Sequence, residues 1–217
     1  MKLYTFHASG SAHRARMALA LKGIDYEPVY VVIGQGSTDL VQPDYLAMNP
    51  SAVVPTLVDG DNVITQTMAI MEYLEESRPE PALLPPDSAG RARVRAMTQV
   101  MIADTHALGT VRVLEYLDKT LEQPDEARKG WARHWNERGF EVVEKMLAED
   151  EGSGRYCHGD QPTMADIALV SQIFVSRKFG VDLASFPSVK QVYENCMELP
   201  AFSDSVPQKQ PDAPAAG

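Results

Sequence analysis

The sequence predicts an α/β domain followed by an all-helical domain, and three observations support this division. Short segments that alternate between β and helical character fill the chain up to residue 76. A cluster of prolines follows, and beyond it almost all apolar residues recur with helical spacing. A chain of 217 residues is long enough for two small domains, each with its own core.

The first part of the chain opens with a strand–helix–strand pattern. Residues 3–6 and 26–32 are rich in aromatic and β-branched side chains, which favours strands. Between them, residues 14–23 place apolar side chains at helical spacing and end at Gly23, a typical residue after a helix. Such an order is built with the helix crossing over one face of a sheet.

A hairpin and a second helix complete the first domain. Residues 56–58 and 62–65 flank Asp59-Gly60-Asp61, a strong signal for a tight turn between antiparallel strands. Residues 68–76 then return to helical spacing. Together with the crossover helix, these elements predict a thioredoxin-like α/β domain over residues 1–79.

Prolines mark the boundary between the domains. Pro79, Pro81, Pro85 and Pro86 exclude a helix and predict a stiff, extended linker over residues 80–86.

Helical spacing dominates the rest of the chain and predicts an all-helical domain over residues 87–217. The expected helices cover residues 90–121, 125–148, 163–179 and 188–199. Thr163 and Asp166 have the spacing of a capping box, so Asp166 is interpreted as a helix cap rather than as an acid or base. Residues 206–217 are rich in Pro, Ala and Gln and are expected to form a loose tail.

Composition excludes several classes of function. The net charge of −10 argues against binding to nucleic acid or to an anionic membrane surface. No apolar run approaches the length of a membrane span, and the N-terminus lacks the pattern of a signal peptide. The only cysteines, Cys157 and Cys196, are interpreted as free thiols of a cytoplasmic protein. No histidine pair has the spacing of a metal site, so no metal is expected.

Three segments carry the chemistry of a binding site. Ser9, Gly10 and Ser11 lie between the first strand and its helix, where hydroxyls and unpaired backbone N–H groups can hold a thiolate or oxyanion. Val54 precedes Pro55 at the expected start of a strand, where its backbone could pair with an extended peptide. Gln66-Thr67 opens a helix that could bind a carboxylate, although this segment taken alone favours Thr67 as an N-cap without a ligand.

Together these segments match the thiol, backbone and carboxylate of glutathione, and the sequence resembles the zeta class of the glutathione transferase family. The resemblance covers nearly the whole chain. The motifs that carry it include Ser9-Gly10-Ser11-x-His13-Arg14, Val53-Val54-Pro55-Thr56-Leu57, Gln66-Thr67-x-Ala69-Ile70 and Thr163-Met164-Ala165-Asp166. Within the class, the chain resembles the bacterial isomerases of maleyl keto acids.

The resemblance implies a role for each matching residue. Ser9 would stabilise the glutathione thiolate, with Ser11 as a second catalytic hydroxyl. Val54, next to a cis Pro55, would pair with the cysteinyl backbone. The other implied contacts to glutathione are Gly10, His13, Arg14, Gln66, Thr67 and His106, and the implied contacts to substrate are Arg112 and Arg177.

The implied activity is a glutathione-dependent cis–trans isomerisation of maleylacetoacetate or maleylpyruvate in the breakdown of aromatic compounds. In that reaction the thiolate adds to a cis-enone, the former double bond rotates, and the thiolate leaves. The resemblance also implies a homodimer, whereas the sequence itself shows no interface.

The chain departs from the isomerase pattern at three positions. Ala8 stands where the isomerases have an arginine, and Thr110-Val111 stands where they have Asn-Arg. Loss of cationic groups weakens the case for a dicarboxylate substrate, because a bidentate arginine is not replaced without consequence. Two alternatives therefore remain open: a transferase or dehalogenase acting on a less charged electrophile, and a non-catalytic interaction module with the same fold.

Overall fold

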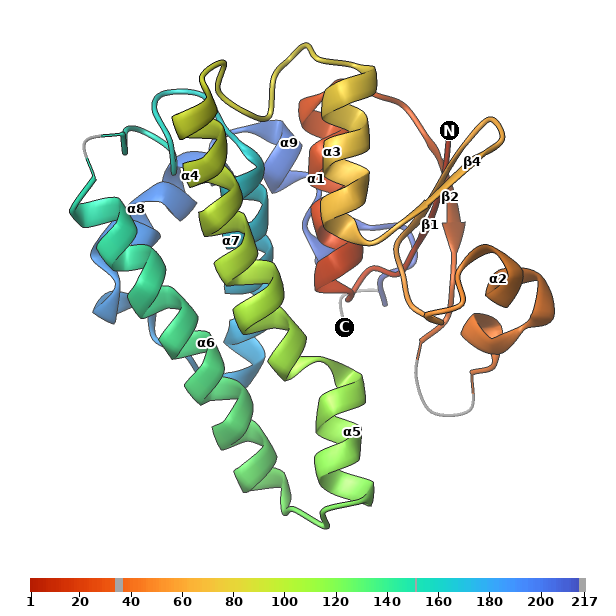
Figure 1. Cartoon of the computed structure of the whole chain (residues 1–217). Coiled ribbons are helices and arrows are strands. Elements are labelled where there is room, and N and C mark those ends of the chain that lie inside the picture. The colour runs from red at the N-terminus through yellow and green to blue at the C-terminus, as the bar shows by residue number, and fades with distance from the viewer. Residues whose placement is uncertain (34–36, 151, 215–217) are drawn as a thin grey trace. The chain divides into compact units, whose positions relative to one another are not determined.

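In a computed structural model, which describes residues 1–33, 37–150 and 152–214, the chain forms two compact units (Figure 1). Met1–Leu83 and Leu199–Gly217 make up the first, here called the α/β unit. Leu84–Glu198 make up the second, the helical unit. The predicted combination of a thioredoxin-like α/β fold and a helical fold is confirmed.

The α/β unit contains a four-stranded mixed sheet with the strand order β2-β1-β3-β4. The strands are β1 (Lys2–Thr5), β2 (Glu27–Tyr30), β3 (Thr56–Asp59) and β4 (Asn62–Thr65). β1 pairs parallel with β2 and antiparallel with β3, and β3 pairs antiparallel with β4. The predicted hairpin turn is present, with Gly60 at a positive φ of 59°.

Helices cover both faces of this sheet (Figure 1). α1 (Gly10–Leu21) and α3 (Thr67–Ser77) pack against each other on one face, and α2 (Pro43–Met48) lies on the other. The Tyr45 ring on α2 meets the Tyr4 ring on β1 edge to face, with 5.5 Å between their centroids. The core between α1, α3 and the sheet is formed by fully buried apolar side chains, which include Leu3, Met17, Leu19, Leu57, Ile70, Met71 and Leu74.

Some boundaries in this unit differ from the predictions. α1 begins at Gly10 instead of residue 14, because the Ser9 hydroxyl caps it and the small residues that follow are compatible with a helix. β2 is shorter than the predicted strand, covering only Glu27–Tyr30. α2 was not predicted, although Pro43 occupies a favoured position in its first turn.

The helical unit consists of four longer helices and several short ones. The longer helices are α4 (Ser88–Gln99), α6 (Asp125–Ala148), α7 (Met164–Ser176) and α8 (Pro187–Met197). The shorter elements are the π-helix η2 (Val100–Thr105), the 3₁₀ turns η3 (His106–Gly109), η4 (Arg177–Phe179) and η5 (Leu183–Ser185), and α5 (Val111–Lys119). α4 and α6 each pack against η2, and α7 packs against α4 and α8.

The prediction of one continuous helix over residues 90–121 is wrong. The chain passes from α4 through η2 and η3, and Thr110 then has an extended backbone before α5 begins. Apolar spacing continues across the break, so periodicity alone gave no sign of it. Gly139 on α6 faces the distorted turn, where an added Cβ would overlap the Thr105 hydroxyl and lie 3.0 Å from Thr105 Cβ.

We expect Gly139→Ala to destabilise the protein by about 1–3 kcal/mol, because the new methyl group would force Thr105 out of its packed position. Gly130 is the matched control on the same helix, since an added Cβ there meets nothing within 4 Å. Gly130→Ala should raise stability slightly, by up to about 1 kcal/mol, through helix propensity. Urea unfolding of both variants checks the contrast, and equal effects would contradict the close approach.

The capping box at the start of α7 is confirmed. Asp166 Oδ2 accepts hydrogen bonds from the Thr163 backbone N–H at 2.7 Å and from its hydroxyl at 2.8 Å. Asp166 Oδ1 accepts a further hydrogen bond from the Cys157 N–H at 2.8 Å. Burial raises the pKa of Asp166, and these hydrogen bonds oppose the rise. The residue therefore organises the fold, as the sequence indicated.

The C-terminal segment differs from the expected loose tail in the helical domain. Contacts group it with the α/β unit, where α9 (Pro200–Ser203) packs against α1 and Phe202 is fully buried. A 3₁₀ turn, η6 (Pro207–Lys209), follows. The Gln210 side chain donates hydrogen bonds to the carbonyls of Asp204 and Val206, both at 3.1 Å. Local hydrogen bonds therefore give order to a segment whose composition indicates none.

Candidate active site

The strand register brings the three chemical segments to one end of the sheet. Tyr4 on β1 is paired with Thr56 on β3, and Thr56 is paired with Thr65 on β4. The turn at Ser9 comes just after β1, Val54-Pro55 lies just before β3, and Gln66-Thr67 lies just after β4. All three segments therefore extend beyond the same row of paired residues.

Ser9 is the N-cap of α1. Its Oγ accepts a hydrogen bond from the Ala12 N–H at 3.2 Å, and its own N–H donates to the Phe6 carbonyl at 3.1 Å. The side chain is half-buried. Because the backbone uses the hydroxyl only as an acceptor, its hydrogen can be donated to an anion at the helix N-terminus.

Ser11 is held by a buried cation. Arg14 Nη2 donates to Ser11 Oγ at 2.9 Å, and the Arg14 side chain is 1% exposed. Burial lowers the pKa of Arg14 to about 9, so the guanidinium stays charged at neutral pH. A positive charge next to Ser11 favours an anion there. Arg14 and His13 are both buried, and the contact of each with glutathione that the resemblance implies stays a prediction.

His13 is neutral at physiological pH. Burial, together with the charges of Arg16 and Arg14, lowers its pKa to about 3. In the unfolded chain its pKa is about 6.5, so between these values the unfolded state binds more protons. The stability contributed by neutral His13 is present above pH 6.5 and is lost as the pH falls toward 3.

We expect the His13 ring signals in an NMR titration of the folded protein to stay unchanged between pH 8 and 5. We also expect the free energy of unfolding to fall by at most about 1.4 kcal/mol per pH unit from this group below pH 6.5. His13→Gln should reduce that slope. A His13 midpoint near 6.5 in the folded state would contradict the burial of its ring.

Val54 has a backbone suited to pairing with a peptide. The Val54–Pro55 bond is cis, as the resemblance implies. Among the described residues, the N–H and C=O of Val54 form no hydrogen bond with another backbone group. Tyr45 and Asn49 fix the preceding residue, since the Tyr45 hydroxyl and Asn49 Nδ2 both donate to the Val53 carbonyl, at 2.6 and 2.7 Å.

Gln66 and Thr67 form the start of α3. Gln66 is the N-cap and has a φ of 68°, unusual for a residue with a side chain. Its side chain does not cap the helix, and Thr67 is already inside the helix, so interpreting Thr67 as the N-cap is wrong. The first turn contains no acidic residue, which leaves its N–H groups suited to a carboxylate.

His106 lies in the helical unit at the end of a buried hydrogen-bond chain. Its Nδ1 is 3.1 Å from Gln172 Oε1, Gln172 Nε2 donates to Asn136 Oδ1 at 2.6 Å, and Asn136 Nδ2 donates to the Ala132 carbonyl at 2.7 Å. Because the Gln172 oxygen can only accept, the ring hydrogen is on Nδ1. This series of hydrogen bonds fixes the orientation of the His106 ring.

The predicted substrate arginines occupy different elements of the helical unit. Arg112 is exposed on α5. Arg177 is exposed at the end of α7, where its Nη2 donates to the Tyr193 hydroxyl at 2.7 Å and its guanidinium lies 5.2 Å from the ring centroid. Tyr193 thereby restrains the Arg177 side chain while its charge stays accessible.

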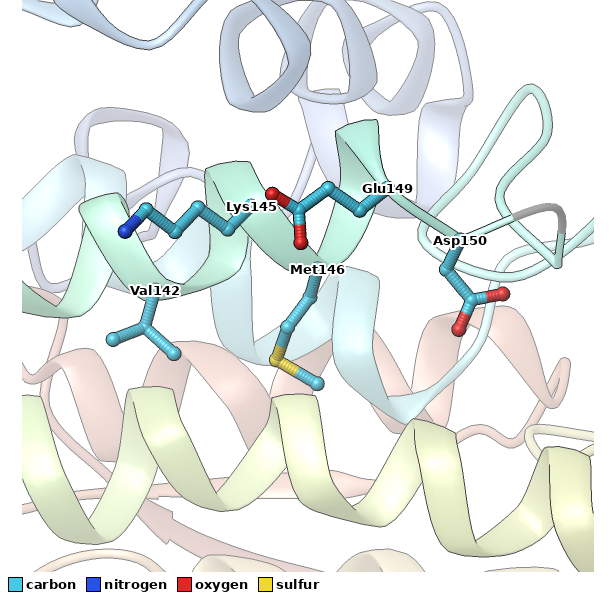
Figure 2. Close-up of a pocket in the computed structure, with 5 residues that line it drawn as sticks. All are labelled: Val142, Lys145, Met146, Glu149 and Asp150. Carbon is cyan, nitrogen blue, oxygen red and sulfur yellow. The ribbon is translucent and has the colours of Figure 1, made fainter.

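A surface hollow in the helical unit lies along the end of α6 (Figure 2). Its lining residues are Val142, Lys145, Met146, Glu149 and Asp150. None of them belongs to the predicted site, so the hollow gives no support for a ligand there. Across the described ranges, His, Cys, Asp and Glu form no cluster of three suited to a metal ion. The helices in these ranges also include none that is long and apolar enough to cross a membrane.

Family comparison agrees with this arrangement. Residues 1–76 match the glutathione S-transferase N-terminal domain, and residues 106–200 match the glutathione S-transferase C-terminal domain. The chain belongs to the glutathione S-transferase family. A maleylpyruvate isomerase from a Ralstonia species is 44% identical over 213 residues, which cover 98% of this chain and 100% of that protein.

Solved structures of other glutathione S-transferases extend the likeness. A holo maleylpyruvate isomerase described as a bacterial zeta-class glutathione S-transferase has a TM-score of 0.95 and 43% identity, with 99% of this chain and 100% of that chain covered. A maleylacetoacetate isomerase from Anaeromyxobacter dehalogenans has a TM-score of 0.84 and 39% identity, covering 98% and 97%. The latter holds dicarboxyethyl glutathione and citrate in its active site.

Sequence reasoning missed the residues that support the site. Tyr45, Asn49, Gln172 and Asn136 act through buried hydrogen bonds between elements, which no local spacing indicates. The Asn49-Pro50 pair is the one usable local signal, since Asn before Pro favours a turn.

Proposed function

We propose that this glutathione S-transferase is a glutathione-dependent isomerase that converts a maleyl keto acid, maleylpyruvate or maleylacetoacetate, to its trans isomer. The observation that carries the proposal is the meeting of the Ser9 turn, Val54 and Gln66-Thr67 at one end of the sheet. Full-length identity of 44% to a maleylpyruvate isomerase supports the same reaction.

The residues present fit glutathione. Ser9 donates its hydroxyl hydrogen to the sulfur at the N-terminus of α1, and Ser11 lines the same place beside the charge of Arg14. The Val54 backbone pairs with the peptide, and the first turn of α3, with Gln66 and Thr67, holds the γ-glutamyl carboxylate. When bound, glutathione supplies the thiolate that adds reversibly to the cis-enone and so permits rotation.

We assign Arg112, Arg177 and His106 of the helical unit to ligand binding. Arg177, restrained by Tyr193, and Arg112 bind the substrate carboxylates. A guanidinium suits this role because it can form two parallel hydrogen bonds to one carboxylate. The resemblance assigns His106 to glutathione, and Gln172 holds its ring. Dicarboxyethyl glutathione in the active site of a related isomerase supports a site that accepts a dicarboxylate together with glutathione.

A second candidate is transfer or dehalogenation with a less charged electrophile. Ala8 and Val111 stand where the isomerases have arginine, and Val111 is 63% exposed. An apolar side chain at that position suits an electrophile without two carboxylates.

Mixing the protein with each maleyl keto acid, with and without glutathione, and following loss of the cis-enone absorbance tests the first proposal. We expect turnover only when glutathione is present. No turnover of either acid, together with conjugation of a neutral electrophile, would replace the isomerase by the second candidate. Failure to bind glutathione in calorimetry would leave only the non-catalytic module.

We further infer a cytoplasmic homodimer in which residues 80–86 act as the linker between the two domains. The free, buried thiols of Cys157 and Cys196 support a reducing compartment. Light scattering of the purified protein tests the dimer, and a monomer at micromolar concentration would exclude it.

A further inference from the structure

The C-terminal segment contacts the turn that leads to Ser9. The Asp212 carboxylate accepts a hydrogen bond from the His7 backbone N–H, with Oδ2 2.8 Å from the nitrogen. The same Oδ2 lies 3.4 Å from His7 Nδ1. The two side chains are only 14% and 18% exposed, so the contact is largely shielded from water. A hydrogen bond to a charged acceptor in such surroundings is stronger than a neutral one.

Arg16 also links the turn before Ser9 to the C-terminal segment. Its Nη2 donates to the carbonyls of His7, at 3.2 Å, and Ser205, at 3.4 Å. Its Nη1 donates to Thr5 Oγ1 at 3.0 Å and to the Phe6 carbonyl at 3.3 Å. Burial lowers the Arg16 pKa to about 10, and the charge of Asp212 is among those that oppose the fall. The buried Arg16 guanidinium and the Asp212 carboxylate thus both form hydrogen bonds to the turn.

The backbone of this turn fixes Ser9. The Ser9 N–H donates to the Phe6 carbonyl at 3.1 Å, and that carbonyl also accepts from Arg16. His7 lies between these residues, so the hydrogen bond from its N–H to Asp212 restrains the segment that sets the position of the Ser9 hydroxyl. The expected role of Ser9 requires that its hydroxyl be held in place before the sulfur arrives.

We propose that Asp212 is a positioning residue for the thiolate site: its carboxylate holds the His7 turn so that Ser9 presents its hydroxyl to glutathione. The C-terminal segment therefore supports the turn that carries Ser9. This inference rests on the proposed role of Ser9 and extends the site to a segment about 200 residues away in sequence, since the bond joins positions 205 apart.

Amide hydrogen exchange in the glutathione-free protein tests the contact itself. We expect Asp212→Ala to speed exchange at the His7 and Ser9 amides by about tenfold or more, since a charged hydrogen bond contributes about 1.5–3 kcal/mol. Asp212→Asn keeps an acceptor oxygen and should restore most of the protection. Asp204→Ala is the matched control, because Asp204 lies in the same segment but pairs with the exposed Lys209.

Glutathione titrations of the same variants test the functional consequence. We expect Asp212→Ala to raise the apparent pKa of the bound thiol and to weaken binding about tenfold, with Asp204→Ala unchanged. Unaltered exchange at His7 and Ser9 in Asp212→Ala would overturn the proposal, as would faster exchange with an unaltered thiol pKa. A wild-type protein that shows the Asp212-dependent protection but binds no glutathione would overturn the proposed function and, with it, the positioning role, while leaving the contact established.

Discussion

Replacing Ser9 with alanine is expected to lower kcat/KM for the isomerisation by about 10²-fold or more, the usual effect of removing one donor to a developing anion. The hydroxyl is placed for this role because its oxygen already accepts from the Ala12 N–H, leaving its hydrogen for the sulfur. Steady-state kinetics at saturating glutathione measure the change.

Two variants separate the chemical role of Ser9 from its structural role. As an N-cap, Ser9 also stabilises α1, so Ser9→Ala should cost about 1 kcal/mol in unfolding free energy. Ser9→Thr keeps a hydroxyl and a capping oxygen and should retain most of the activity. Ser11→Ala should lower the unfolding free energy less than Ser9→Ala does, because Ser11 is not the N-cap of α1. An alanine variant as active as the wild type would remove Ser9 from the mechanism.

Glu75→Gln is expected to cost about 3–5 kcal/mol in unfolding free energy, the largest effect on stability that we infer. Glu75 Oε2 accepts from Lys22 Nζ at 2.7 Å and from the Leu83 N–H at 2.8 Å. The Lys22 side chain is fully buried and that of Glu75 is 6% exposed. Neutralising the carboxylate would leave a buried ammonium whose remaining hydrogen bonds, to the carbonyls of Arg78 and Pro79, do not balance its charge.

This ion pair connects the end of α1 to the end of α3 and to the start of the linker, so its loss should loosen all three. Urea denaturation measures the effect. The double variant Lys22→Met/Glu75→Gln should lose less than the sum of the single variants, because no charge is left buried. Glu141→Gln breaks the exposed pair with Arg138 and serves as the control, with no measurable change expected. Equal effects at both sites would contradict the importance of burial.

The sequence predicted elements whose signals are local. The hairpin turn at Asp59-Gly60, the capping box at Thr163 and the helix that ends before Gly23 each follow from the chemistry of a few neighbouring residues. The same is true of Ser9, whereas the cis bond before Pro55 was implied by the family resemblance. These features formed the basis for both the fold and the candidate site.

Features that depend on distant partners were not predictable in this way. The π-helix that follows α4 lies against Gly139 on α6, a contact that periodicity does not record. The role proposed for Asp212 depends on a hydrogen bond from the backbone N–H of His7, at the opposite end of the chain. Arg14 matches the motif, but only the fold shows that it is buried and donates a hydrogen bond to Ser11. Sequence patterns indicate local conformation. Burial and hydrogen bonds between residues far apart in the sequence decide which motif residues can touch a ligand.

The most direct test of thiolate stabilisation is a pH titration of the thiolate absorbance of glutathione bound to the wild-type protein. A free thiol has a pKa of about 8.5. We expect the midpoint of the bound thiol to lie clearly below that value, and to move back toward it in Ser9→Ala. A bound thiol that titrates at the free value in the wild type would contradict the role given to the N-terminus of α1.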